Sequence, residues 1–247
     1  MKENKIRLDQ LIADRGLTSS RSRAASLILS GYVLCNDNLI TKAGYLVKTD
    51  SILKIRKPKH EWVSRGGIKL DYAINKFSYN VEGVIAADIG SSTGGFTDVL
   101  LKRGAKKIYS IDVGYGQLSW KLRKDNRVIV MERVNARYLD EKNFKDLINL
   151  IVCDVSFISI KKALPSILNL VAKNSRLISL IKPQFEAGKI NVKKGGVVKD
   201  QTIHREVCKN INLWLEDDMK WSVEGICQSP IEGPAGNKEF FIAAKKK

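Results

Sequence analysis

The chain has 247 residues, of which 43 are Lys or Arg and 26 are Asp or Glu, so its formal net charge is +17 at pH 7. Its 44% hydrophobic and 28% charged residues are typical of a globular protein and exclude a wholly disordered or fibrous chain. So large a positive charge indicates an acidic partner.

The cysteines and the apolar segments bear on the cellular location of the protein and on whether it has metal sites or disulfides. Four cysteines lie far apart, at positions 35, 153, 208 and 227, and the chain has two histidines. We therefore expect neither a metal site nor a disulfide framework, and a cytoplasmic location. The first five residues carry charges of both signs, and no run of about 18 apolar residues occurs, so neither a signal peptide nor a membrane span is expected.

Residues 1–60 are predicted to form a small basic α+β domain with its linker. They include 12 Lys or Arg and 5 Asp or Glu, whereas the rest of the chain has 31 and 21. The spacing of apolar residues predicts a first helix that stops at Gly16, and Ser19 or Ser20 can cap a second helix that runs to Ser30. Short strands are expected at 32–35, 39–40 and 51–55, with a linker at 56–59.

Residues 61–247 are predicted to form a second domain, in which apolar strand-like runs alternate with helical stretches. This alternation is typical of a Rossmann-like α/β fold, a doubly wound and mostly parallel sheet with helices on its faces. We expect strands at 84–89, 107–113, 128–131, 150–153, 177–181, 221–227 and 240–244, and helices at 96–103, 117–123, 158–172 and 201–216.

A glycine-rich loop follows the first of these strands and opens a helix, in the sequence Asp88-Ile89-Gly90-Ser91-Ser92-Thr93-Gly94-Gly95-Phe96. Glycines let the backbone turn sharply and approach a ligand closely, and the N-terminus of the helix faces that ligand. Asp112, at the end of the next strand, can accept hydrogen bonds from a ribose hydroxyl pair. We therefore predict an adenosine-type cofactor pocket rather than a glycine-rich turn beside a solvated acid.

The spacing inside the loop bears on which cofactor binds there. Its glycines follow the pattern G-x-x-x-G-G and not the G-x-G-x-x-G that favours a pyrophosphate. The negative charge of Asp88 would repel a pyrophosphate, whereas it would attract the ammonium group of a methionine moiety. S-adenosylmethionine is therefore favoured over NAD, and the predicted cofactor-binding residues are Asp88, Gly90, Ser92, Thr93, Gly94, Gly95, Asp112 and Asn135.

Asp154 and Lys182 are predicted to lie beside this pocket, because each follows a strand and ligands of open parallel sheets bind at the carboxyl ends of strands. Asp154 precedes Val-Ser-Phe and not the Pro-Pro-aromatic run of enzymes that methylate amino groups. Cys153 lies inside a strand without a neighbouring histidine, which favours a small buried residue over a nucleophile. A Lys paired with an Asp beside a methyl donor favours activation of a hydroxyl group.

Sequence blocks along nearly the whole chain resemble a known family. The segments Ile6 to Leu11 and Ser20 to Val33 resemble the alpha-L RNA-binding domain first seen in the small-subunit ribosomal protein S-four. The rest resembles the hemolysin A (TlyA) family of ribosomal RNA 2′-O-methyltransferases, which have an FtsJ-like catalytic domain. The blocks that carry this resemblance are Val63 to Leu70, Asp88 to Thr97, Cys153 to Ser159, Lys182 to Gly188, Lys194 to Val198, and Ser229 through Gly236 to Phe240.

The resemblance implies methyl transfer from S-adenosylmethionine to a ribose 2′-hydroxyl, with cytidine as the expected nucleoside and ribosomal RNA or ribosomal subunits as the partner. It also implies a catalytic tetrad of Lys69, Asp154, Lys182 and Glu239, although each taken singly could be a surface charge or a strand cap. A ribose hydroxyl is a poor nucleophile until a base takes its proton or cations stabilise the oxyanion. Lys182 is the candidate for that role, and we expect Lys69 and the sulfonium to lower its pKa.

Candidate RNA contacts are the basic residues outside the tetrad. A cluster of lysines between residues 188 and 199 could line an RNA channel or form a solvated loop. The predicted RNA-binding residues are Arg7, Arg21, Arg23, Arg65, Lys189, Lys193 and Lys194. The alternatives are a membrane-active hemolysin, a non-catalytic RNA-binding protein and an NAD-dependent enzyme, and the sequence assigns no oligomeric state.

Overall fold

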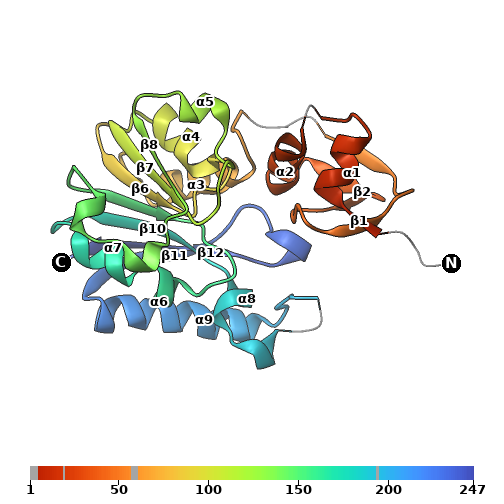
Figure 1. The fold of residues 1–247 in the computed structure, drawn as a ribbon. Helices are drawn as coiled ribbons and strands as arrows, with labels where there is room; N and C mark the ends of the chain where they lie inside the picture. Colours follow the sequence, from red (N-terminus) through yellow and green to blue (C-terminus); the bar gives the residue numbers. More distant parts are fainter. Residues whose placement is uncertain (1–4, 19, 57–60, 193–194) are drawn as a thin grey trace.

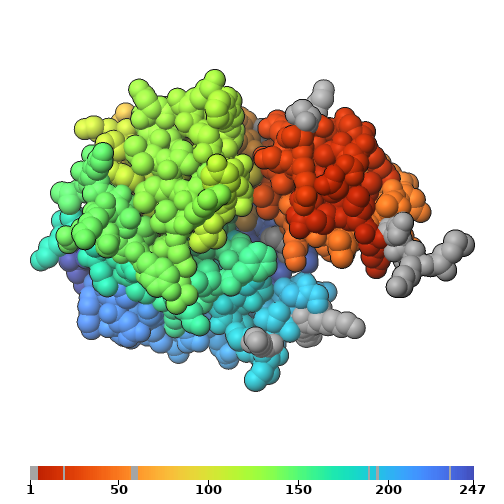
Figure 2. Space-filling model, in the orientation of Figure 1, coloured from red at the N-terminus to blue at the C-terminus, as the bar shows by residue number. Residues whose placement is uncertain are grey.

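The computed structural model describes residues 5–18, 20–56, 61–192 and 195–247. A small N-terminal lobe lies beside a larger lobe formed by the rest of the chain (Figures 1 and 2). Ser19 and most of the predicted linker, from Lys57 to Lys59, lie outside the described residues.

The N-terminal lobe consists of two helices packed on short strands. Its core is made of apolar side chains from both helices, among them Leu8, Ile12 and Ile28, which are completely buried. The Ser20 side chain caps the second helix by accepting a hydrogen bond from the backbone N–H of Arg23. The elements are β1 (Lys5–Arg7), α1 (Leu8–Asp14), α2 (Arg21–Leu29), β2 (Val33–Cys35), β3 (Asn38–Leu39), β4 (Leu46–Lys48) and β5 (Leu53–Ile55).

The strands of this lobe form two small sheets, of which the sequence predicted only one. The antiparallel sheet β3-β2-β5 corresponds to the expected strands. The pair β1-β4 was not predicted, because three-residue strands are too short to show alternation.

The larger lobe is built on one sheet of seven strands, in the order β11-β12-β10-β9-β6-β7-β8. Strands β10, β9, β6, β7 and β8 are parallel to one another, whereas β12 is antiparallel to both of its neighbours. The predicted mostly parallel, doubly wound sheet is confirmed. The strands are β6 (Ile85–Ile89), β7 (Lys107–Asp112), β8 (Val128–Glu132), β9 (Leu150–Cys153), β10 (Arg176–Ile181), β11 (Trp221–Gln228) and β12 (Phe240–Lys246).

Helices cover both faces of this sheet (Figure 1). Neighbouring strand residues alternate between two cores: Val152 packs with α3, α4 and α5, whereas Cys153 packs with α6, α7 and α9. The helices are α3 (Gly66–Lys76), α4 (Gly95–Lys102), α5 (Trp120–Arg123), α6 (Ile160–Ala163), α7 (Pro165–Leu170), α8 (Pro183–Glu186) and α9 (Gln201–Leu213). Short helical turns lie at η1 (Ala136–Tyr138), η2 (Glu141–Asn143), η3 (Lys189–Asn191), η4 (Trp214–Asp218) and η5 (Pro234–Gly236).

Helix α8 was not predicted, α5 is shorter than the expected 117–123, and two further differences have a local cause. The helix expected at 158–172 is divided at Leu164, because Pro165 has no N–H to donate and begins a new helix instead. Helix α3 was not predicted, since it opens on Gly66 and Gly67, which have low helix propensity. Within the described residues, no helix combines the length and apolarity needed to cross a lipid bilayer.

Candidate active site

The glycine-rich loop between β6 and α4 passes close to the end of β9. Gly90 has φ +83°, and a Cβ there would lie 2.9 Å from the carbonyl oxygen of Asp154. Gly94, with φ +94°, precedes α4, and a Cβ would lie 2.2 Å from a methyl carbon of Leu122. Both conformations favour glycine, because other residues rarely adopt positive φ and the space is filled. The loop therefore holds its backbone beside Asp154.

Asp112 fixes the shape of this loop. Its Oδ2 accepts a hydrogen bond from the backbone N–H of Ser92 at 2.8 Å, and its Oδ1 accepts one from that of Gly114 at 2.7 Å. Each carboxylate oxygen keeps a lone pair that a ribose hydroxyl can use. The Ser92 Oγ lies 3.3 Å from the Oε1 of Gln117, which is a contact that the sequence did not indicate.

Asp88 lies completely buried beneath the loop. Its Oδ2 accepts a hydrogen bond from the Thr97 hydroxyl at 2.6 Å, while its Oδ1 is a buried oxygen without a hydrogen-bond partner among the described residues. Burial raises the pKa of Asp88 to about 7, although the Thr97 hydrogen bond opposes this shift. A buried, unpartnered carboxylate oxygen at a glycine-rich loop fits the ammonium group of a methionine moiety.

Lys182 and Asp154 form an ion pair at the ends of the two neighbouring strands β10 and β9. The Nζ of Lys182 lies 2.5 Å from the Oδ1 of Asp154, and it also donates to the Ser156 hydroxyl at 2.9 Å. The side chains of the pair are 9% and 21% exposed. Ser156 belongs to a block that the sequence singled out, but no role was predicted for it, since a serine in a turn gives no local signal.

Lys69 and Glu239 form a second ion pair, which is almost completely buried. The Nζ of Lys69, on α3, donates to the Oε2 of Glu239 at 2.6 Å. Helix α3 reaches this position because its start packs closely on the start of α4: a Cβ on Gly95 would lie 2.3 Å from the Ser64 Oγ. Gly233 leaves room for the carboxylate, since a Cβ there would lie 2.1 Å from the Oε1 of Glu239.

The antiparallel strand β12 brings the two ion pairs together. Ile181 at the end of β10 pairs with Phe240 at the start of β12, and one further step of this register sets Lys182 opposite Glu239. The charge of Lys69 also acts on Asp154, and that of Glu239 acts on Lys182. The four predicted tetrad residues therefore lie together at the rim of the sheet beside the glycine-rich loop.

The electrostatics of Lys182 differ from the expectation. Burial opposes its positive charge, but the carboxylates of Asp154 and Glu239 more than compensate, so the pKa of Lys182 is raised and not lowered. Burial likewise disfavours the charged form of Asp154, and Lys182 and Lys69 overcome it, so that the pKa of Asp154 is lowered. Sequence reasoning expected the carboxylates of Asp154 and Glu239 to offset only some of the positive charge, whereas in the structure their effect on the pKa of Lys182 prevails.

Comparisons with known proteins agree with this arrangement. Residues 62–246 match the model of the FtsJ-like methyltransferase family, and residues 6–53 match that of the S4 domain. The chain belongs to the FtsJ-like methyltransferase family. It is 43% identical over 239 residues to "Hemolysin A" of Brachyspira hyodysenteriae, covering 96% of this chain and 98% of that protein.

Two further relatives place this FtsJ-like methyltransferase in the hemolysin A (TlyA) group. It is 39% identical over 239 residues to the "16S/23S rRNA (cytidine-2'-O)-methyltransferase TlyA" of Mycobacterium tuberculosis, covering 96% of this chain and 89% of that protein. A solved structure of a candidate hemolysin from Streptococcus thermophilus has a TM-score of 0.76 and 39% identity, covering 99% of this chain and 90% of that chain.

Thr93, Asn135 and Cys153 differ in their exposure. Thr93 is buried in the glycine-rich loop. Asn135 is exposed at the start of η1, where its side chain caps the turn by accepting from the N–H of Arg137. Cys153 is completely buried inside β9, and burial raises the pKa of its thiol to about 12. The interpretation of Cys153 as a small buried residue is confirmed.

The predicted RNA-binding residues lie in three different environments. Arg7 and Arg21 both form ion pairs with the buried Asp9, and each is about half exposed. Arg23 is exposed on the same helix as Arg21. Arg65 donates to the backbone carbonyl of Glu232, and its side chain lies against Gly31 of the N-terminal lobe, where a Cβ would be 2.8 Å from the Arg65 Cδ. Lys193, Lys194 and the side chain of Lys189 lie outside the described residues.

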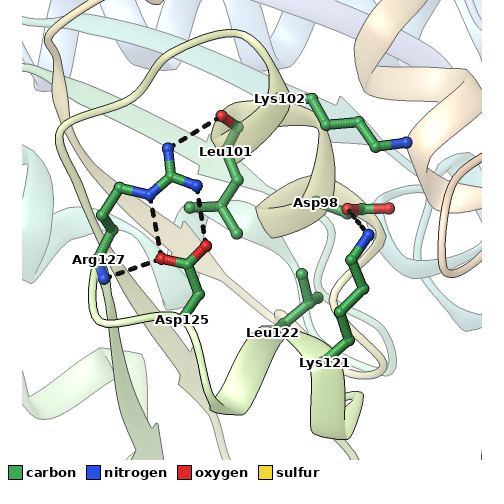
Figure 3. A pocket seen from close by; sticks show the side chains of 7 residues that line it. All are labelled: Asp98, Leu101, Lys102, Lys121, Leu122, Asp125 and Arg127. Carbon is green, nitrogen blue, oxygen red and sulfur yellow. Dashed lines mark hydrogen bonds and ion pairs between the residues drawn. The ribbon is translucent and has the colours of Figure 1, made fainter.

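Two of the cavities of the methyltransferase lobe differ in their lining. The one in Figure 3 has a volume of about 110 Å³, and in it Lys121 pairs with Asp98 and Arg127 with Asp125, whereas Lys102 pairs with Glu61 outside the lining. The other has a volume of about 630 Å³, and its lining includes residues that follow Asp154 and Lys182 closely in the sequence. Its lining is Phe157, Ile158, Ser159, Lys162, Gln184, Phe185, Gly188 and Val192.

Proposed function

We propose that this protein transfers a methyl group from S-adenosylmethionine to a ribose 2′-hydroxyl of ribosomal RNA, at a cytidine. The observation that carries the proposal is the meeting of two buried Lys–carboxylate pairs beside the glycine-rich loop. The named activity of the Mycobacterium tuberculosis relative supports the cytidine ribose as the acceptor.

The residues of the loop would hold the methyl donor. Asp112 offers carboxylate oxygens to a ribose, and the unpartnered oxygen of Asp88 suits an ammonium. The donor, when bound, supplies an electrophilic methyl group on a positively charged sulfur. The absence of a Cβ at Gly90 and Gly94 lets the loop pack against Asp154 and Leu122, which fixes the backbone that would face the donor.

The tetrad would prepare the acceptor hydroxyl. Because the pKa of Lys182 is raised, its ammonium is charged at neutral pH and can stabilise negative charge that develops on the ribose oxygen. The hydroxyl proton must leave as the methyl group bonds to the oxygen, and Lys182 can accept it only as a neutral amine, after its ammonium has released a proton to water; a positive charge on a bound donor would favour that release. Asp154 and Ser156 hold the Lys182 ammonium in position, and the Lys69–Glu239 pair forms the wall beside it.

The two lobes would divide the work between them. We assign residues 1–60 to RNA binding, since this segment matches the S4 domain and presents exposed arginines, and residues 61–247 to methyl transfer. Electrostatic attraction to phosphates would supply most of the RNA affinity.

The test is transfer of tritiated methyl groups to ribosomal RNA, followed by nuclease mapping of the labelled nucleotide. Free RNA and assembled subunits would be compared, with the Lys182→Ala variant as the inactive control. We expect label in 2′-O-methylcytidine, and label on a base would contradict the proposal. A thermal shift with S-adenosylmethionine and none with NAD would support the donor, because a ligand stabilises the state that it binds.

A further inference from the structure

Asp9 is a buried carboxylate of the N-terminal lobe and has no part in the proposed methyl transfer. It is the second residue of α1 and is only 4% exposed. An acid in the first turn of a helix interacts favourably with the helix dipole, but this effect does not require burial. A negative charge also opposes the attraction of a basic lobe to phosphates. The role of Asp9 therefore depends on the side chains that it contacts.

The carboxylate of Asp9 joins two arginines from different elements. Arg7, on β1, donates from its Nε to the Oδ1 of Asp9 at 3.0 Å and from its Nη2 to the Oδ2 at 2.8 Å. The Nε of Arg21, the first residue of α2, lies 3.2 Å from the same Oδ2. Both cations are thus held against one oxygen atom, close enough to contact a single phosphate group together.

The Asp9 carboxylate is itself fixed in place and charged. Its Oδ1 also accepts a hydrogen bond from the backbone N–H of Gln10 at 2.9 Å, and the backbone N–H of Asp9 donates to the carbonyl of Ala43 at 3.1 Å. Burial favours the neutral acid, but the hydrogen bonds and charges of Arg7 and Arg21 outweigh burial, so the pKa of Asp9 is lowered. At neutral pH the two arginines therefore share a fixed negative charge.

Both arginines keep donors that can reach a ligand. Their side chains are 48% and 50% exposed. A guanidinium carries N–H groups on three nitrogens, of which Arg21 uses only its Nε toward Asp9, while Arg7 leaves its Nη1 out of the pair. The remaining N–H groups match the oxygens of a phosphate, for which a guanidinium is well suited.

Gly44 makes room for the guanidinium of Arg7. A Cβ at Gly44 would lie 2.7 Å from the Nη1 of Arg7 and 3.0 Å from its Cζ. Because the guanidinium is the end of a flexible side chain, a larger residue at position 44 would displace it. The carboxylate of Asp9 and the backbone at Gly44 therefore define the position of Arg7 together.

We propose that Asp9 is a positioning residue for RNA binding, which holds Arg7 and Arg21 together as one binding site for a phosphate group of the RNA backbone. The proposal rests on the proposed function, since it takes ribosomal RNA as the ligand. Two neighbouring guanidinium groups repel each other, and the carboxylate between them offsets this repulsion and fixes both groups before RNA binds. Loss of the Asp9 charge should therefore weaken RNA binding, although it makes the lobe more positive.

The test measures the binding of ribosomal RNA to full-length Asp9→Asn at several salt concentrations. Asp14→Asn is the matched control, because Asp14 lies on the same helix and is exposed, and its carboxylate accepts from Gln10 and not from an arginine. For Asp9→Asn we expect the slope of log K against log salt concentration to fall by about 0.7 to 0.9, as for one lost phosphate contact, and the affinity to fall about fivefold to tenfold at about 0.1 M salt. Asp14→Asn should keep the slope and bind at least as tightly as wild type.

The salt slope separates positioning from a loss of stability. A variant that only destabilises the lobe lowers the fraction of protein that binds, but each folded molecule keeps its phosphate contacts and therefore its slope. Gly44→Ala is a second variant that displaces the guanidinium of Arg7 without any change in charge, and its slope should fall as well. In methyl transfer, the KM of both variants for RNA should rise, while kcat stays within about threefold of wild type.

Two results would overturn the positioning role. One is an Asp9→Asn variant that binds RNA as tightly as Asp14→Asn with the slope of wild type. The other is a loss of affinity from Asp9→Asn that persists in the Arg7→Ala/Arg21→Ala background, because a residue that acts through the arginines has no effect once they are gone.

Measuring binding and methyl transfer separately distinguishes this proposal from the proposed function. If wild-type protein binds ribosomal RNA but transfers no methyl group to it, the proposed function fails, and the effect of Asp9→Asn on binding still decides the role of Asp9. If wild-type protein methylates RNA and Asp9→Asn binds it like Asp14→Asn, only the positioning role fails. If wild-type protein does not bind ribosomal RNA, both fail.

Discussion

The Nζ of Lys69 donates a hydrogen bond to the Oε2 of Glu239 across 170 positions of the chain, in a site where the two side chains are 8% and 0% exposed. Desolvation makes such a pair a weak source of stability, yet removal of one partner leaves a buried charge uncompensated. We therefore expect this ion pair to contribute to methyl transfer and to add little to the stability of the folded protein.

This ion pair predicts that Glu239→Ala and the double variant Lys69→Met/Glu239→Ala are both inactive. The two variants should differ in their unfolding free energy. Glu239→Ala should lose about 3–5 kcal/mol of unfolding free energy, because Lys69 stays buried without its partner. The double variant should recover most of that loss and remain inactive. Denaturant unfolding and methyl transfer measure the two effects, and recovered activity in the double variant would show that the pair is only structural.

Lys182→Ala should abolish methyl transfer while donor binding changes little. The ammonium is assigned to the acceptor oxygen, so kcat should fall at least about a hundredfold, as for loss of one donor that stabilises a developing oxyanion. Calorimetry should give a Kd for S-adenosylmethionine within threefold of wild type. Lys162→Ala, an exposed lysine of the neighbouring cavity, is the control. A kcat of Lys182→Ala within tenfold of wild type would contradict the role assigned to Lys182.

Gly94→Val and Asp112→Ala should each weaken donor binding at least tenfold. At Gly94 the new side chain collides with Leu122, and at Asp112 the loop loses two backbone hydrogen bonds. Gly83→Val is the control, since Gly83 also has positive φ but a Cβ there meets nothing within 4 Å. Calorimetry that shows unchanged donor binding in both variants would refute the pocket.

Arg23→Ala should reduce the salt dependence of RNA binding. If Arg23 contacts one phosphate, the slope of log K against log salt concentration should fall by about 0.7 to 0.9. Arg205→Ala is the control, because Arg205 is exposed on α9 of the other lobe. A fragment of residues 61–247 should bind the donor but show a much flatter slope, and an equal slope would exclude the N-terminal lobe as the RNA anchor.

Asp88→Asn should remove a pH dependence of stability. The pKa of Asp88 is about 7 in the folded protein and near 3.8 when solvated, so between these values the folded state holds a proton that the unfolded state has lost. The unfolding free energy of the wild type should therefore fall as pH rises from about 4 to 7, by up to about 4 kcal/mol relative to Asp88→Asn. Asp50→Asn, at the surface, should follow the wild type. Parallel curves for wild type and Asp88→Asn would contradict the shifted pKa.

Most strands of the large sheet could be predicted from the local sequence, because buried parallel strands such as β6 and β9 appear in it as short apolar runs. It missed α3, where Gly66 and Gly67 obscure the periodicity that Leu70 and Ile74 would otherwise show. The helix is stable because its apolar face is buried against the sheet and α4, and this tertiary effect has no signature in the local sequence.

The candidate site could be predicted only through residues that are exceptional in type or spacing. Asp88, Asp112 and the glycines stand out around a strand end. No feature of the local sequence distinguishes Lys69 or Glu239, and only the family resemblance indicated them. In the structure their side chains form a hydrogen bond. Ser156 received no predicted role, because its contact is with Lys182, 26 positions away in the sequence.

The reversed direction of β12 affects the order in which a growing polypeptide becomes functional. Synthesis proceeds from the amino end, so the ribosome releases the other six strands of the large sheet before β12. Until β12 docks between β10 and β11, Lys69 has no carboxylate partner and β10 presents an open edge. A nascent chain can thus form its N-terminal lobe early, whereas the pair of Lys69 and Glu239 is complete only after β12 has left the exit tunnel.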